Sequence, residues 1–473
     1  MTTDSSPVAE PLPSSPPEAW EPLHRLARLA GRPLERFLHI EAASGIVLLI
    51  AALCALGWAN SSWADSYASL WRTPIGFTLG SFSFVRSAEW VVNDGLMVIF
   101  FFVVGMEIRR EMHHGELSEW RRAALPAVAA LGGMVAPAGL YLLVAGEPAT
   151  RSGWGVPMAT DIAFAVGILA LLGKRVPSAL RVLLLALAVI DDLGAIVVIG
   201  AFYSSGINPA GLLIAAAGVA GVVGLQRIGV RAKLVYVAPA VVTWAGIYAA
   251  GIHPTIAGVI VGLLTPVRAW LGPDGFVLGL RKQLDEVARA IPNGVPTHEL
   301  AETLRHVDST RREALSPAES LIATLHPWVA FGIMPIFALA NAGVAVAGVT
   351  LDTVAWKALG GVIVGLVLGK PLGVLLAVWL ALRLRLGTLP AGLTMRHVVV
   401  LGVVAGVGFT MALFIASLAF ENAAIFQAAK LGILVASAAA ALLALTLGRL
   451  WLSPASAQGV AQSADEAECS TEV

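Results

Sequence analysis

The sequence predicts an all-α polytopic membrane protein with about twelve transmembrane helices. Its 473 residues are 57% hydrophobic and only 13% charged, whereas a soluble globular chain averages about 25% charged residues. The apolar residues are gathered into runs of roughly 20, the length that an α-helix needs to cross the hydrocarbon core of a bilayer. Water could not solvate such a chain, so we expect membrane lipid to surround it.

Charge and cysteine content exclude several kinds of partner. The formal net charge is zero, whereas a protein that binds nucleic acid usually carries a basic surface. The two cysteines, Cys54 and Cys469, are too few and too far apart for a disulfide framework or a zinc site. We therefore expect no nucleic-acid partner and no bound cofactor.

Twelve apolar runs are the candidate transmembrane helices. The seventh and eighth are short, and only Ala250 and Gly251 separate them, so the count is open by one. The runs are residues 39–60, 88–112, 122–144, 154–173, 178–203, 208–226, 233–249, 252–266, 320–345, 356–382, 395–419 and 427–451.

Lysine and arginine predict the orientation, because cytoplasmic connections carry an excess of these residues. Connections after even-numbered runs hold thirteen of them, and connections after odd-numbered runs hold four. Residues 267–319 are left out of the comparison because long loops obey the rule poorly. We therefore expect both termini in the cytoplasm, with the chain in the inner membrane.

A short connection after the first run has the pattern of a β-hairpin. Residues 75–85 alternate apolar with small or polar residues around Gly80 and Ser81, which predicts two strands and a tight turn. The orientation places this hairpin on the extracytoplasmic side. A lone hairpin is marginal in water, so pairing with a second copy would favour a homodimer.

Three further segments lie outside the predicted spans. Residues 267–319 are charged and interrupted by prolines, and they predict a cytoplasmic insertion whose simplest form is a solvated helical loop. Residues 1–36, rich in Pro and Ser at their start, and the acidic residues 453–473 predict disordered cytoplasmic tails. The transmembrane domain therefore extends over residues 37–452.

Two adjacent aspartates lie in the middle of the fifth run. A charge at the centre of a bilayer costs from about 3 to above 10 kcal/mol, so Asp191 and Asp192 are functional candidates. Adjacent helical residues point about 100° apart, so one carboxylate can line a cavity while the other meets a partner. Two close carboxylates in a low dielectric do not both ionise easily. The pair can hold protons or a hard cation such as Na⁺ or Li⁺, and competition for the same oxygens would give exchange.

Thr160 and Asp161 form a second candidate site in the fourth run. Pro157 and small residues interrupt this run, which frees backbone carbonyls and exposes half-helix ends. Carbonyl and threonine oxygens suit a hard cation, and Asp161 can neutralise positive helix ends. A proline kink with a locally satisfied aspartate is the alternative.

The eleventh run is interrupted in the same manner, by glycines around Thr410. Two broken helices at corresponding places in two halves are the best sequence indication of a transporter site. A glycine-rich span taken alone more often marks close helix packing. The residues concerned are Gly402, Gly406, Gly408 and Thr410.

Lys370 lies in the middle of the tenth run. An ammonium group at this depth must pair with a carboxylate or lose its proton. The preceding Gly365 and Gly369 superficially resemble a phosphate-binding loop. Their spacing is wrong for such a loop and no Ser or Thr follows the lysine, so the sequence excludes it.

Five more ionisable residues are weaker candidates: Asp94, Glu107, Glu111, His253 and His326. Glu107 and Glu111 lie one helical turn apart near the cytoplasmic end of the second run, where interfacial salt bridges and pH sensing are both compatible with the pattern. Asp94 lies at the other end of that run. His253 borders a short run, and a structural histidine is its simplest interpretation.

Together these strings closely resemble the NhaA family of sodium/proton antiporters. The resemblance extends from about Leu38 to Leu452, apart from residues 267–319. Its motifs, in the order of the family, are Ala-Thr-Asp-Ile-Ala-Phe-Ala, Val-Ile-Asp-Asp-Leu-Gly-Ala-Ile, His-Pro-Thr-Ile-Ala-Gly-Val, Leu-His-Pro-Trp-Val, Gly-Lys-Pro-Leu-Gly and Gly-Val-Gly-Phe-Thr-Met-Ala.

The resemblance implies a fold and a role for each site residue. It implies inverted repeats in which the fourth and eleventh helices are discontinuous and cross. Asp191 and Asp192 would bind the protons and the Na⁺ or Li⁺ ion, with Thr160 nearby. Asp161 and Lys370 would compensate half-helix dipoles, and Lys370 would form a switchable pair with Asp191.

The resemblance also implies how transport is regulated. Asp94, Glu107, Glu111 and His253 match positions tied to transport or to the pH response. The family members are secondary transporters rather than enzymes, are electrogenic and become active at alkaline pH, and they dimerise partly through the outer hairpin. This chain departs from well-known members at Ile322-Ala323, where they carry a Glu-His pair, which puts the pH profile in doubt.

Four other functions compete with exchange: symport, intramembrane catalysis, channel conduction and a scaffold role. A sodium-coupled symporter needs a substrate cavity with additional polar side chains, and few are present in the runs. An intramembrane enzyme needs a nucleophile or metal motif such as His-Glu-x-x-His, and the sequence has none. A channel would conduct Na⁺ without countertransport, and a scaffold would have no use for buried charges.

Overall fold

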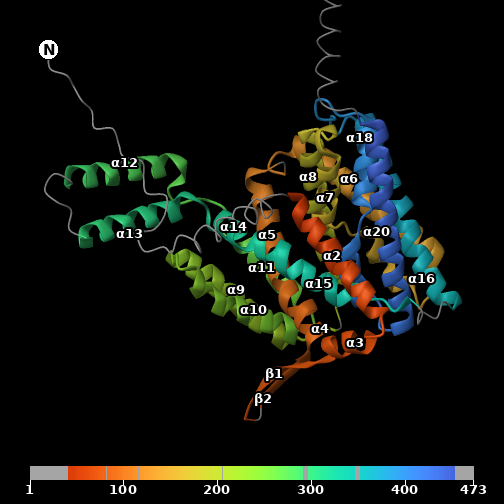
Figure 1. Cartoon of the computed structure of the whole chain (residues 1–473). Helices are drawn as coiled ribbons and strands as arrows, with labels where there is room; N and C mark the ends of the chain where they lie inside the picture. Colours follow the sequence, from red (N-terminus) through yellow and green to blue (C-terminus); the bar gives the residue numbers. More distant parts are fainter. Residues whose placement is uncertain are drawn as a thin grey trace, which may run out of the picture.

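The computed structural model describes residues 41–80, 82–115, 117–204, 206–290, 297–346 and 352–452. Within these ranges the chain is helical apart from connections and one small antiparallel sheet (Figure 1). The predicted tails, 1–36 and 453–473, lie outside the described residues.

The first half of the chain carries the hairpin and the first broken span. Its α-helices, strands and segments of 3-10 or π-helix (η) are, in order, α2 (Glu41–Ala59), α3 (Ala64–Arg72), β1 (Pro74–Leu79), β2 (Phe82–Ser87), α4 (Ala88–Trp90), η1 (Val91–Leu96), α5 (Met97–His114), α6 (Trp120–Ala145), η2 (Arg151–Met158), α7 (Ile162–Leu172), η3 (Gly173–Arg175), α8 (Ser178–Phe202) and α9 (Pro209–Ile228).

The second half carries a peripheral helix pair and the second broken span. Its elements are η4 (Lys233–Tyr236), α10 (Val237–Ala249), α11 (Thr255–Leu264), α12 (Gly272–Ala290), α13 (Thr297–Ala314), α14 (Pro317–Trp328), η6 (Val329–Ile333), α15 (Met334–Asn341), α16 (Thr353–Val364), η8 (Gly365–Gly369), α17 (Lys370–Arg383), α18 (Met395–Ala405), α19 (Phe409–Ala419) and α20 (Ala423–Trp451).

Length and apolar composition qualify many of these helices to cross a membrane. Among the described residues, eight helices are long and apolar enough, and two further pairs qualify if each bent pair is one span. Two shorter apolar helices, Lys233–Ala249 and Thr255–Leu264, correspond to the short seventh and eighth runs. The prediction of a multi-pass helical membrane protein is confirmed.

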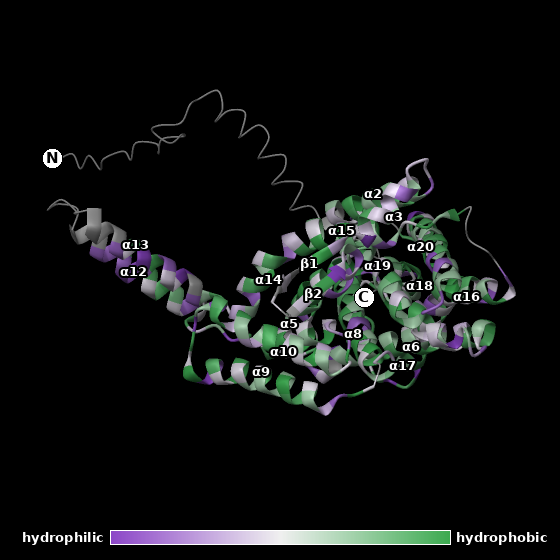
Figure 2. Cartoon of the chain, turned by 90° about the horizontal axis from the view of Figure 1, so that it is seen from below, coloured by the Kyte–Doolittle hydropathy of each residue, from purple (hydrophilic) through white to green (hydrophobic). Residues whose placement is uncertain are grey.

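The outward faces of the helices support this assignment. Apolar side chains on α6, α9 and α20 remain exposed, among them Leu143 (82%), Leu213 (72%) and Leu442 (65%). Figure 2 shows the apolar colour continuing over the outside of the bundle. A broad exposed apolar surface suits contact with lipid rather than with water.

The predicted β-hairpin is confirmed at one end of the bundle (Figure 1). β1 and β2 are antiparallel, from Pro74 opposite Ser87 to Leu79 opposite Phe82. Gly80, directly after β1, has φ +60°, a conformation that a residue with a Cβ rarely adopts. We call this end of the bundle the hairpin end.

The insertion at 267–319 contains the helix pair α12 and α13, which projects sideways from the bundle (Figures 1 and 2). At its base Arg231 forms an ion pair with Glu313 and lies over the Trp270 ring, 4.5 Å from the centroid. Lys233 Nζ donates to Ser320 Oγ at 2.6 Å. The base of the pair is therefore fastened to the segment between α9 and α10.

Candidate functional site

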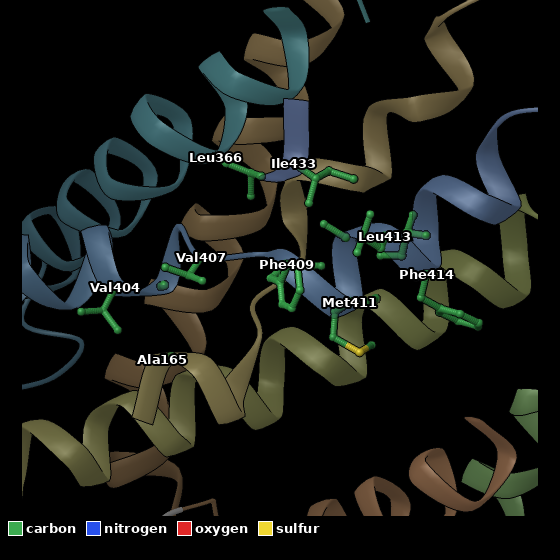
Figure 3. Packing of buried hydrophobic residues seen from close by; sticks show 14 of the residues in the cluster. Ala165, Leu366, Val404, Val407, Phe409, Met411, Leu413, Phe414 and Ile433 are labelled. Carbon is green, nitrogen blue, oxygen red and sulfur yellow. The ribbon is translucent and has the colours of Figure 1, made fainter. Parts of the chain in front are cut away.

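The breaks in the fourth and eleventh spans contact each other. Three residues separate η2 from α7 and three separate α18 from α19, where the axis bends by 48°. Asp161 N donates to Val407 O at 2.8 Å, a backbone bond from one break to the other. A Cβ on Gly408 would lie 3.0 Å from Ala159 O, so glycine permits this approach. Figure 3 shows the apolar side chains, including Val407 and Phe409, that enclose the second break.

Asp161 joins the two half-helices that start at these breaks. Its Oδ1 accepts from Phe164 N at 3.0 Å in the first turn of α7. Its Oδ2 accepts from Thr410 N at 3.1 Å and from the Thr410 hydroxyl in the first turn of α19. Because a helix N-terminus carries positive partial charge, one carboxylate stabilises two such ends.

Asp191 meets Thr160 and Lys370 beside the same breaks. Thr160 Oγ1 lies 2.6 Å from Asp191 Oδ2 and 3.0 Å from Ala405 O, the last carbonyl of α18. Lys370 Nζ forms an ion pair with the same Asp191 oxygen and donates to Met158 O at the end of η2. Lys370 therefore lies at the negative end of one helical segment, as a compensating charge should.

One carboxylate oxygen of the pair on α8 is buried without a donor among the described residues. This oxygen is Asp191 Oδ1, and Asp192 beside it is buried as well. Both side chains are nearly inaccessible, at 1% and 2% exposure. Buried polar oxygens without partners are rare, and these are the hard donors that Na⁺ or a proton would satisfy.

The oxygen cluster does not have the composition of a resident metal centre. Groups of three or more His, Cys, Asp or Glu side chains able to hold a metal ion are absent from the described part of the chain. Two carboxylates and a threonine hydroxyl suit a monovalent ion that must also leave.

Asp94 and His253 form a separate cluster nearer the hairpin end. His253 Nε2 lies 3.2 Å from Asp94 Oδ1, and Nδ1 lies 2.8 Å from the Thr255 hydroxyl. The His253 ring meets the edge of Phe414 on α19, with centroids 5.4 Å apart. This histidine therefore bridges α11, the second span and the second broken span.

Glu107 and Glu111 lie further along α5, toward the end remote from the hairpin. Glu107 is close enough to Asp192 for the two charges to repel. Glu111 lies 3.5 Å from Arg110. The structure therefore brings Glu107 toward the pair on α8.

Several polar groups that the structure buries or frees were not singled out from the sequence. The carbonyls of Met158 and Ala405 acquire their roles only through the breaks. Lys430 is 4% exposed on α20, with Nζ 4.3 Å from the Phe426 ring centroid. Its signal, a lone lysine in an apolar run, is the same one that marks Lys370. Asn341, at the end of α15, is fully buried.

The chain matches known proteins over almost its whole length. The sequence model of the family described as Na+/H+ antiporter 1 matches residues 35–447. The chain belongs to the NhaA family of Na⁺/H⁺ antiporters. The Na(+)/H(+) antiporter NhaA 2 of Myxococcus xanthus is 67% identical over 471 residues, which cover 100% of both chains. The antiporters of the same name from Sorangium cellulosum and Pseudomonas putida KT2440 are 56% and 50% identical, covering 97% and 90% of this chain and 98% and 94% of theirs.

Membership of the NhaA family confirms the resemblance seen in the motifs. Na⁺/H⁺ antiporters are secondary transporters and not enzymes, which agrees with the expectation from the sequence. The family assignment and the apolar helices together establish a multi-pass membrane protein.

Proposed function

We propose that the chain exports cytoplasmic Na⁺ or Li⁺ across a bacterial inner membrane in exchange for protons. The ions compete at Asp191 and Asp192, with Thr160 as a third oxygen donor. The supporting observation is the buried, unpartnered Asp191 Oδ1 beside a second buried carboxylate, Asp192. Asp191 has the Lys370 ammonium as a partner on its other oxygen, whereas Asp192 needs a proton or a cation to offset the cost of its burial.

Lys370 competes with the transported cation for Asp191. Its ammonium occupies Asp191 Oδ2, so a cation that takes this oxygen must displace the lysine. In the proposed cycle, protons load the pair from outside, cytoplasmic Na⁺ displaces them, and rocking of one helix bundle against the other exposes Na⁺ to the outside. Asp161 holds the two half-helix ends in place throughout.

The proposed exchange is electrogenic. Asp191 and Asp192 can release two protons for each monovalent cation that binds between them, so net charge moves in every cycle. Exchange is regulated by pH, with Asp94, Glu107, Glu111 and His253 as the candidate residues. Because Ile322 and Ala323 replace an ionisable pair, the pH profile is expected to differ from that of other members.

The proposed topology has twelve spans arranged as inverted repeats, with both termini and residues 267–319 in the cytoplasm. Residues 37–452 form the antiporter domain. The hairpin end then faces outward, where β1 and β2 can pair with a second copy in a homodimer. The exposed hydrogen-bonding edges of a two-stranded sheet favour such pairing.

Everted vesicles that contain the protein test the exchange directly. After a respiratory substrate acidifies the lumen, Na⁺ addition should dequench a pH-sensitive dye because the antiporter releases luminal protons. Asp192→Asn should abolish the response. Asp274→Asn, at an exposed aspartate on α12, should respond like the wild type. A full response from Asp192→Asn would contradict the proposal.

Proteoliposomes separate exchange from channel conduction. With an outward H⁺ gradient and no Na⁺ gradient, an antiporter accumulates ²²Na⁺ against its own gradient. A channel only equilibrates Na⁺, so the absence of uphill accumulation would exclude an antiporter.

A further inference from the structure

A reciprocal amide pair joins the second span to α15 near the hairpin end. Asn341 Nδ2 donates to Asn93 Oδ1 at 2.7 Å, and Asn93 Nδ2 donates to Asn341 Oδ1 at 3.3 Å. Asn341 is fully buried, and its amide also donates to Phe337 O at 3.0 Å. Each amide therefore satisfies the other within the membrane span, where an unpaired amide would be costly.

The α15 side of this pair is held independently. Tyr67 Oη lies 2.9 Å from both Leu339 O and Ala340 O, the carbonyls just before Asn341. Asn60 contacts the segment after α15 and not α15 itself, because its Oδ1 accepts from Val346 N at 2.8 Å, so Tyr67 is the side chain that holds the end of the helix. Asn341 is thus a fixed point against which the second span can be held.

The Asn93 side lies in a π-helical segment. η1 covers Val91–Leu96, so Asn93 and Asp94 are consecutive residues within it. They point in different directions, Asn93 toward Asn341 and Asp94 toward His253. A π turn contains one residue more than an α turn. If η1 relaxed to α-helix, the residues before the bulge would rotate by about 100° relative to those after it, and both contacts could not survive.

We propose that Asn93 and Asn341 are a positioning pair that fixes the π-helical register of η1 and thereby holds Asp94 against His253. The His253 ring packs on Phe414, one turn from Thr410, which binds Asp161. The pair thus sets the position of a histidine that contacts the broken span. Only its effect on transport, and not the positioning itself, rests on the proposed function.

Cross-linking tests the positioning without any need for transport. The native cysteines are first removed by Cys54→Ser and Cys469→Ser. New cysteines are then introduced by Asp94→Cys and His253→Cys, and the rate at which a short thiol-specific linker joins them reports the distance between positions 94 and 253. Asn93→Leu with Asn341→Leu removes both amides together, so neither is left unsatisfied and the protein should still fold. Because the double variant loses two hydrogen bonds between membrane helices, we expect its cross-linking rate to be about tenfold lower than that of the protein with both asparagines.

Two controls make the result decisive. Asn60→Leu removes an amide at the same end that does not contact η1, and it should leave the cross-linking rate within about twofold. An unchanged rate in the folded double variant would overturn the proposal. An equal decrease in Asn60→Leu would also overturn it, because the effect would then be a general loosening of this end.

Transport then tests the consequence with native Asp94 and His253. Asn93→Leu with Asn341→Leu should lower the maximal exchange rate about tenfold and leave the apparent KM for Na⁺ within about twofold, because it does not touch the Asp191–Asp192 site. Slower cross-linking with unchanged transport would uphold the positioning and count against a transport role for Asp94.

Discussion

Asp161 and Asp191 are equally buried, at 1% exposure each, but their surroundings are opposite. Both oxygens of Asp161 accept hydrogen bonds, two of them from backbone amides at helix N-termini. Asp191 has donors on one oxygen only, among the described residues. A fully satisfied carboxylate suits a structural role, whereas a partly satisfied one suits the ion exchange that we propose for the α8 pair.

The difference follows from where each residue lies in its helix. Asp161 stands at a break, where the first amides of a new helix have no intrahelical acceptor and can donate to a side chain. Asp191 and Asp192 are in the middle of α8, where the backbone amides already donate to carbonyls one turn earlier. An interior position therefore leaves a carboxylate dependent on side chains and ions.

The largest expected effect separates the two aspartates. Asp191→Asn should weaken Na⁺ binding at least about 30-fold, because it removes one partner of a buried charge pair worth about 2 to 5 kcal/mol. Asp161→Asn should lower the free energy of unfolding by about 1 to 3 kcal/mol and change Na⁺ affinity less. Calorimetric Na⁺ titration and thermal unfolding in detergent measure the two quantities. The opposite ranking would break the comparison.

An intermediate effect concerns pH. Protons and Na⁺ compete for the α8 pair, so protonation at low pH excludes Na⁺ and the apparent KM for Na⁺ should fall as pH rises. For each competing proton, the apparent KM for Na⁺ can change by at most about tenfold per pH unit. Initial exchange rates in proteoliposomes between pH 6 and 9 measure the slope. The Asp161→Asn variant should show the same dependence of KM on pH. A KM for Na⁺ that does not change with pH in the wild type would contradict competition between protons and Na⁺ at this site.

The smallest expected effect concerns Thr160. Thr160→Val preserves shape but removes the hydroxyl that contacts Asp191, so the apparent KM for Na⁺ should rise about 2- to 10-fold, the range for one hydrogen bond. Thr160→Ser keeps the hydroxyl and should stay within about twofold of the wild type. Equal KM values for the Val and Ser variants would remove Thr160 from the ion site.

Much of the fold followed from local patterns. Each of the twelve predicted runs contains an apolar helix, a bent pair or a broken span, and the alternation over 75–85 gave the hairpin. The glycines of the eleventh run correctly indicated a break. The sequence did not show which of these glycines lies against Ala159 O, because that contact depends on the position of the other broken span.

The site was predicted less completely. Intramembrane charge identified Asp191, Asp192, Asp161 and Lys370, since the cost of burying charge is visible in any apolar run. Asn93 and Asn341 gave no such signal, because an uncharged amide is cheaper to bury and its partner lies 248 positions away. The carbonyls of Met158 and Ala405 are unrecognisable in sequence, because every residue has a carbonyl and only the breaks free these two.

The amino-acid sequence by itself determined that the chain is a helical membrane protein, where charges are buried and where two spans are interrupted. These properties depend on composition and short-range periodicity, which the chain carries locally. Only the tertiary structure decided that the two interruptions touch, that Lys370 and Thr160 share one oxygen of Asp191, and that the other oxygen has no donor. Those facts depend on the relative placement of helices, which local patterns do not encode.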